Sequence, residues 1–151
     1  MRVLTVGRPR PSWAEQMEAY RVRAQGAWAW EHRVVAAARG KEPEAARRRR
    51  EGDLLLAELT PQEFVIALDE HGEELDSIAL ARRLAQYRDR GRPLALVIGG
   101  ADGLDSRVLE RADWAWSLSR LTWPHELAAV MVAEQLYRAQ SLTEGHPYHR
   151  A

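Results

Sequence analysis

The sequence predicts an α/β fold in which a mostly parallel sheet is covered by helices on both faces. Five short runs of apolar, β-branched or aromatic residues alternate with five stretches of helical pattern. Two of the runs, residues 64–69 and 94–100, are almost continuously apolar, which is typical of parallel strands buried on both faces. The chain has 151 residues and no internal linker or repeat, so residues 1–151 are expected to form one domain.

The strands are placed by composition and by the residues that stop each run. The first run ends at Gly7, the third is followed by turn-forming residues 70–72, and the fourth runs into Gly99 and Gly100. The expected strands, in chain order, are residues 1–6, 28–36, 64–69, 94–100 and 114–119.

Capping residues and prolines place the helices. Ser12 is expected to cap the first helix, Pro43 begins the second, Asp76 or Ser77 caps the third, and Pro124 fits the first turn of the last. The expected helices are residues 12–26, 43–60, 76–90, 105–111 and 124–140.

Composition indicates a soluble globular protein. Hydrophobic residues make up 46% of the chain and charged residues 29%. No apolar run approaches the ~20 residues that span a bilayer, and the first residues lack a signal-peptide pattern, so we expect a cytoplasmic protein that does not bind membranes. The absence of cysteine excludes disulfides, thiolate metal sites and cysteine nucleophiles.

Basic residues are concentrated in the first part of the chain, although the net charge is zero. Residues 1–60 hold 12 Arg or Lys against 8 Asp or Glu, and 21 of the 22 basic residues are Arg, which favours phosphate contacts. The run Arg47 to Arg50 has two interpretations. Glu44 and Glu51 stand at i,i+4 spacing from Arg48 and Arg47, which favours a solvated helix face, and an RNA-binding role is the alternative.

The segment IGGADG, residues 98–103, has three glycines directly after a predicted strand. Glycine allows positive φ and lets a ligand approach the backbone, so either a tight turn or a ligand-binding turn fits the pattern. The segment matches neither the dinucleotide-binding fingerprint nor the P-loop.

The segment WSLSRLTWPHE, residues 116–126, joins the last strand to the last helix with many polar groups. In a purely structural interpretation Thr122 caps the helix, which leaves Arg120 and His125 unexplained. Ligands of parallel sheets bind beyond the carboxyl ends of the strands. Backbone amides and carbonyls of this segment could bind the edge of an adenine, and Leu118 and Leu121 could pack against the faces of its ring.

Two further segments lie near the C-terminus. The segment LAAVMVA, residues 127–133, is apolar around the whole helix and predicts either a central core helix or a homodimer interface.

The segment EGHPYHR, residues 144–150, combines side chains that titrate, stack on bases and bind phosphate. Metal binding by His146 and His149 is the alternative, but no convincing acidic or cysteine partner lies nearby in the sequence, so no metal site is expected.

Five segments, ALDEHG, LVIGGADGL, WSLSRLTWPHEL, AEQLYRAQSL and GHPYHR, occur in an order and spacing that resembles the ribosomal RNA large subunit methyltransferase H family of SPOUT methyltransferases. The resemblance implies a C-terminal deep trefoil knot and S-adenosylmethionine as cofactor. It also implies N3-methylation of a pseudouridine in 23S rRNA by a homodimer acting on the assembled 70S ribosome. A non-catalytic ribosome-binding relative and a tRNA methyltransferase are the alternatives.

The resemblance, together with Gly99 and Leu118 from the strand-end pattern, gives the expected cofactor site. Its residues are Leu68, Gly99, Gly100, Leu118, Ser119, Arg120, Leu121, Thr122, Trp123 and Pro124.

Methylation of a ring nitrogen that carries a proton also calls for a base. His149 is the expected base, with Tyr148 and Arg150 positioning the substrate and His125 as second choice. The chain departs from many relatives at Leu121, where they have Met, and at Ala129, where they have Arg.

Overall fold

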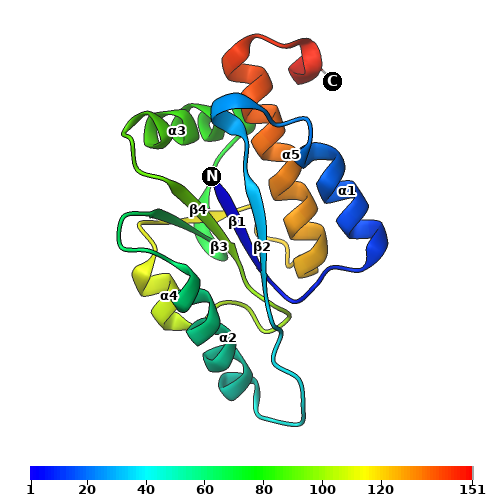
Figure 1. Cartoon of the computed structure of the whole chain (residues 1–151), viewed down its shortest axis with the longest axis vertical. Helices are drawn as coiled ribbons and strands as arrows, with labels where there is room; N and C mark the ends of the chain where they lie inside the picture. The colour runs from blue at the N-terminus through cyan, green and yellow to red at the C-terminus, as the bar shows by residue number, and fades with distance from the viewer. Residues whose placement is uncertain (151) are drawn as a thin grey trace.

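The computed structural model contains a sheet of five parallel strands in the order β2-β1-β4-β3-β5 (Figure 1). It describes the backbone of residues 1–150 and the side chains of residues 1–148. The strands are β1 (Arg2–Val6), β2 (Glu31–Val35), β3 (Phe64–Glu74), β4 (Leu94–Ile98) and β5 (Trp114–Ser117). The α-helices are α1 (Pro11–Arg21), α2 (Glu44–Glu58), α3 (Ser77–Asp89), α4 (Ser106–Arg111) and α5 (His125–Glu144), and short 3-10 turns cover Gly26–Trp28 and Pro147–Arg150.

Helices cover both faces of the sheet, as the sequence predicts. Helices α1, α3 and α5 pack together over one face, and α2 and α4 pack over the other (Figure 1). The α/β prediction is therefore confirmed.

Alternate residues of each central strand enter different cores. Val3, Ile66 and Leu96 pack under α1, α3 and α5, while Leu4 and Val97 pack under α2 and α4. All five are fully buried. Since both faces are covered, these strands have no solvent face, which explains their continuous apolar runs.

Strand β3 continues beyond the sheet edge where the sequence predicts a turn. Residues 70–72 belong to the strand, and its pairing with β5 resumes at Glu73 after a register shift that begins at Leu68. A Cβ on Gly72 would lie 2.8 Å from the backbone carbonyl of Ala115. Glycine at this position therefore permits the end of β3 to pass close over β5, and the turn prediction is wrong.

Two other predicted boundaries are also wrong. Trp28 lies in a 3-10 turn instead of a strand, because the first part of the apolar run, with Trp28 and Trp30 buried, fills the core before β2 begins at Glu31. Helix α1 begins at Pro11 without a side-chain cap, so Ser12 does not cap it. Proline suits this position because its missing N–H is not needed there.

Among residues 1–150, no helix is long and apolar enough to cross a membrane. The trefoil knot remains a prediction of the family resemblance.

Candidate functional site

A cavity of about 430 Å³ lies at the carboxyl ends of β3, β4 and β5. This is the edge of a parallel sheet at which ligands bind. Nine of the predicted site residues line the cavity: Leu68, Gly99, Gly100, Leu118, Ser119, Leu121, Thr122, Trp123 and His125.

Of the five other predicted residues, Arg120, Pro124 and Tyr148 do not line this cavity. Arg120 is directed to the β3 extension and is 90% exposed, and Pro124 is the residue that precedes α5. Tyr148 lies on α5, and the side chains of His149 and Arg150 are outside the described residues.

The glycine turn after β4 forms one wall of the cavity. A Cβ on Gly99 would lie 2.6 Å from the carbonyl carbon of Gly103, and Gly103 itself has φ +80°. The Gly103 N–H donates to the Gly100 carbonyl at 3.1 Å, which closes the turn. Only glycine fits this backbone path, so the prediction of a tight glycine turn is confirmed, and the turn also faces the cavity.

The opposite wall is the segment between β5 and α5, and the Ser119 hydroxyl organises it. This oxygen accepts hydrogen bonds from the Leu121 N–H at 3.1 Å and from the Trp123 indole N–H at 2.9 Å. The Ser117 hydroxyl donates to the Ser119 carbonyl at 2.9 Å. These bonds fold the segment back on itself, so that Leu121 and Trp123 both reach the cavity.

Two contacts join this segment to the extension of β3. The Thr122 hydroxyl donates to Glu70 at 3.2 Å, and the Arg120 guanidinium donates to Glu74 at 3.0 Å. Thr122 does not cap α5, whose first turn lacks a side-chain cap, so the structural interpretation of this residue is wrong. Neither Glu70 nor Glu74 is among the predicted site residues, because the sequence predicts a turn at residues 70–72, where β3 in fact continues to Glu74.

Helix α2 closes the side of the cavity next to the glycine turn. Arg47 donates two hydrogen bonds to the Asp102 carboxylate at 2.8 and 3.0 Å, which lowers the pKa of Asp102 and raises that of Arg47. Arg48 pairs with Glu44 as predicted, and both side chains line the cavity. The predicted pair of Arg47 with Glu51 is absent, since Arg47 turns to Asp102 and Glu51 is buried.

The start of α5 is tied to the loop after β1. Glu126 accepts from the backbone N–H of Arg10 at 2.6 Å and from its side chain at 2.9 Å, and these bonds lower the pKa of Glu126. His125, the first residue of α5, is thereby held at the cavity.

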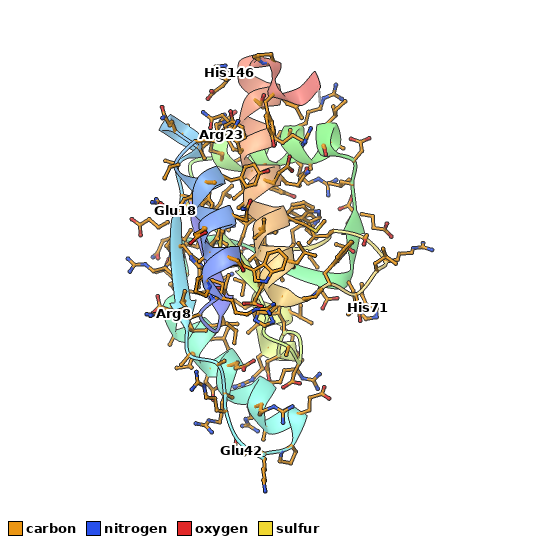
Figure 2. All side chains as sticks on the ribbon, turned by 90° about the vertical axis from the view of Figure 1, so that its right-hand side faces the viewer. Arg8, Glu18, Arg23, Glu42, His71 and His146 are labelled. Carbon is orange, nitrogen blue, oxygen red and sulfur yellow. The ribbon has the colours of Figure 1, made fainter. Side chains whose placement is uncertain are left out.

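The C-terminal tail folds back on α5, away from this cavity. The Tyr148 hydroxyl donates to Glu134 at 3.1 Å, and its ring packs edge-on against Tyr137 with centroids 4.8 Å apart. The Arg23 guanidinium lies over both rings, at 4.1 Å from Tyr137 and 5.0 Å from Tyr148. Burial is the main cause that raises the pKa of Tyr148. Figure 2 shows His146 and Arg23 together near one end of the molecule.

A second hollow, of about 600 Å³, lies between α1 and β2. Its walls include Met17, Trp30 and His32. None of the predicted site residues with a described side chain lines it, and its lining includes no residue of β3, β4 or β5. The functional argument therefore rests on the smaller cavity.

Comparison with known proteins decides the family. The model of the family described as "Predicted SPOUT methyltransferase" matches residues 1–149. The ribosomal RNA large subunit methyltransferase H of Acidiphilium cryptum is 46% identical over 152 residues, covering 100% of this chain and 94% of the relative. The chain belongs to the ribosomal RNA large subunit methyltransferase H family.

A second member of this methyltransferase H family is similar over nearly its full length. The one from Anaeromyxobacter sp. is 44% identical over 151 residues, covering 99% of both chains. Among solved structures, the SpoU methyltransferase AviRb from Streptomyces viridochromogenes, in complex with AdoMet, has a TM-score of 0.48 and 16% identity, covering 93% of this chain and 57% of that one.

Proposed function

We propose that this member of the methyltransferase H family transfers a methyl group from S-adenosylmethionine to N3 of a pseudouridine in 23S rRNA. Family membership supports the coarser activity, methylation of large-subunit rRNA. The observation that carries the proposal is the convergence of nine predicted residues on one cavity at the carboxyl edge of the sheet. The substrate we propose is the assembled 70S ribosome, and the enzyme acts in the cytoplasm as one SPOUT domain.

The cavity has the shape and lining that the cofactor needs. Its volume of about 430 Å³ lies within the range of small-molecule sites, roughly 300–1,000 Å³. The glycine turn presents backbone without side chains, and Leu68, Leu118 and Leu121 supply apolar surface for an adenine. When bound, S-adenosylmethionine supplies an electrophilic methyl group on a sulfonium.

The residues of this chain then position the nucleophile and remove its proton. Methyl transfer is an in-line displacement that requires the reacting atoms at about 3 to 3.5 Å. A base must take the N3 proton, and we assign this role to His149, with Tyr148 and Arg150 holding the base and phosphate of the nucleotide. His125 is the alternative base, and it lines the cavity.

The position of the tail supports a homodimer with shared sites. Glu134, the residue that Tyr148 contacts, is nine positions beyond His125 on α5. That spacing places it about 14 Å along the helix from His125, and the end of α5 at Glu144 lies about 28 Å from His125. Since Tyr148 contacts Glu134 and does not line the cavity of its own chain, we propose that the tail completes the site of the partner subunit.

Helix α5 has a surface that suits such a dimer. Its small residues Ala129 and Ala133 are buried in the subunit, whereas Leu127, Val130 and Met131 are only half-buried. Apolar side chains left half-exposed on a core helix favour burial against a second subunit.

The test is transfer of labelled methyl from S-adenosylmethionine to 70S ribosomes that lack the modification, with free 50S subunits and tRNA assayed in parallel. Mass spectrometry identifies the modified nucleoside. We expect N3-methylpseudouridine in 70S particles alone. Label in tRNA would overturn the substrate, and no transfer despite cofactor binding would favour a non-catalytic ribosome-binding protein.

A further inference from the structure

Glu51 on α2 is a buried acid whose second oxygen has no partner. Glu51 is only 6% exposed, and its Oε1 accepts a hydrogen bond from the Ala38 N–H at 2.9 Å. Among the residues that the structure describes, no hydrogen-bond donor reaches Oε2. A buried carboxylate oxygen without a partner is costly, so its presence calls for a physical explanation.

The unpartnered oxygen lies directly behind the wall of the cavity. It is 2.9 Å from where a Cβ on Gly100 would stand, and Gly100 lines the cavity. The next residue, Gly52, brings α2 just as close to the start of α4, because a Cβ there would lie 2.6 Å from Asp105 Cβ. A glycine inside a helix costs about 1 kcal/mol, and here it permits α2 to press Glu51 against the glycine turn.

Negative charge predominates around the cavity. Among the side chains that the structure describes, four acidic ones line it, Glu44, Asp69, Glu70 and Asp102, against Arg48 and the titratable His125. Outside the lining, Arg47 pairs with Asp102, and Glu51 adds a further acid. Such a field favours a cation, and a buried group is screened less by solvent than the exposed ones are.

The two forms of the proposed cofactor differ in charge by one unit. S-adenosylmethionine carries a sulfonium, an ammonium and a carboxylate, for a net charge of +1. S-adenosylhomocysteine keeps only the ammonium and the carboxylate, so its net charge is zero. In the transfer, the N3 lone pair forms the bond to the methyl carbon. The electrons of the sulfur–methyl bond stay on sulfur, and the N3 proton passes to the base. The positive charge of the sulfonium therefore disappears from the cavity during the reaction.

We infer that Glu51 is a specificity-determining residue that favours the cationic methyl donor over its neutral product. This inference rests on the proposed function. Glu51 does not contact the reacting atoms. It acts through the glycine turn, behind which its unpartnered oxygen places negative charge. This charge attracts the sulfonium of the donor, and the attraction is absent in the neutral product.

Isothermal titration calorimetry tests this with S-adenosylmethionine and S-adenosylhomocysteine, each titrated into the full-length protein. In Glu51→Gln, the preference for S-adenosylmethionine, measured as the ratio of the two Kd values, should fall about fivefold or more relative to the natural protein. Glu58→Gln, on the same helix but 46% exposed and outside the cavity lining, is the matched control, and it should change the ratio less than twofold.

Equal weakening of both ligands in Glu51→Gln, or an equal shift of the ratio in Glu58→Gln, would overturn the inference. Glu51→Asp keeps the charge and loses the bond to Ala38, so it should lower both affinities and retain the preference. A preference lost in that variant would also overturn the inference, whether or not Glu51→Gln folds. If the natural protein bound neither ligand, the proposed cofactor would itself be wrong, a result distinct from all of these.

Discussion

The indole N–H of Trp123 donates to the Ser119 hydroxyl at 2.9 Å, which joins the two ends of residues 119–123 in the segment between β5 and α5. Leu121, between them, donates its backbone N–H to the same oxygen at 3.1 Å. One hydroxyl group thus fixes the path of five consecutive residues at the cavity.

Removing this hydroxyl should weaken cofactor binding more than folding. Ser119→Ala loses two accepted hydrogen bonds in a surface segment, each worth about 1 kcal/mol, so we expect up to about a thirtyfold loss of S-adenosylmethionine affinity. Calorimetry measures the affinity and thermal unfolding the stability. Ser12→Ala, at an exposed position without a capping role, is the control. Unchanged affinity in Ser119→Ala would show that the segment keeps its shape without these bonds.

A side chain at Gly99 should damage both the turn and the cavity. The Cβ of Gly99→Ala would meet the backbone of Gly103 at 2.6 Å, where no flexible side chain can move aside. We expect roughly 2 to 3 kcal/mol of lost stability and loss of cofactor binding, measured by urea unfolding and calorimetry. Ala45→Ser, at an exposed position outside the cavity lining, should change neither. A fully stable Gly99→Ala that still binds cofactor would contradict the geometry of the turn.

Deleting residues 146–151 should abolish methyl transfer and leave cofactor affinity nearly unchanged. The reason is that Tyr148 lies on α5, well away from the cavity of its own chain. Radiolabel transfer and calorimetry separate the two effects. Loss of both together would show that the tail is structural.

Mixing two inactive variants tests whether the tail acts across a dimer. Leu118→Arg should block the cavity and leave the tail intact, whereas the deletion of 146–151 leaves the cavity intact. A mixed dimer then contains one complete site if the tail of one subunit serves the cavity of the other. We expect transfer to return on refolding the two together, whereas no return would place each tail at its own cavity.

The Arg2–Glu63 pair should make stability depend on pH below neutrality. Arg2 donates to both carboxylate oxygens, at 2.7 and 2.6 Å, and the Thr60 N–H donates to one of them at 2.8 Å. Burial alone would raise the pKa of Glu63, but these bonds outweigh it and lower the pKa. Because the folded pKa is depressed, the stabilisation is present above about pH 4.3, the ordinary glutamate pKa, and disappears as pH falls through the folded pKa.

Glu63→Gln should therefore cost about 2 to 3 kcal/mol at pH 7, somewhat less than a fully buried pair would, since Arg2 is partly exposed. In urea unfolding, the free energies of unfolding of Glu63→Gln and of the natural protein should differ less near pH 3 than at pH 7. Glu58→Gln, whose contact with Arg2 is 3.7 Å and exposed, should differ little at any pH. A cost for Glu63→Gln that stays constant from pH 7 to 3 would rule out a charge effect.

Much of this fold is predictable from the sequence because burial leaves a direct pattern. Continuous apolar runs indicated a doubly covered parallel sheet, and the glycine turn and the segment after β5 were placed at the edge where the cavity lies. What pattern cannot express is which distant segments meet. The β3 extension over β5 depends on Gly72, a residue that locally favours a turn.

The contribution of α2 was hidden for a similar reason. Glu51 follows four arginines, and local spacing predicts an ion pair on a solvated face. In the folded chain Asp102, 55 positions away from Arg47, takes that arginine instead, and Glu51 turns into the core. Such exchanges between partners are decided by tertiary packing, which a single sequence does not display.

Helix α5 starts at the cavity with His125 and runs 20 residues without a break before the tail begins. In a dimer that shares its sites, the length of this helix sets the distance between His125 at its start and the C-terminal tail that follows its last residue. One inserted residue would advance the tail by about 1.5 Å and swing it through about 100°, which would turn its side chains away from the partner's substrate. In the proposed dimer, the length of α5 would therefore set the distance between the residues that share one active site, and we expect lengthening it to damage activity as much as loss of a contact with the RNA.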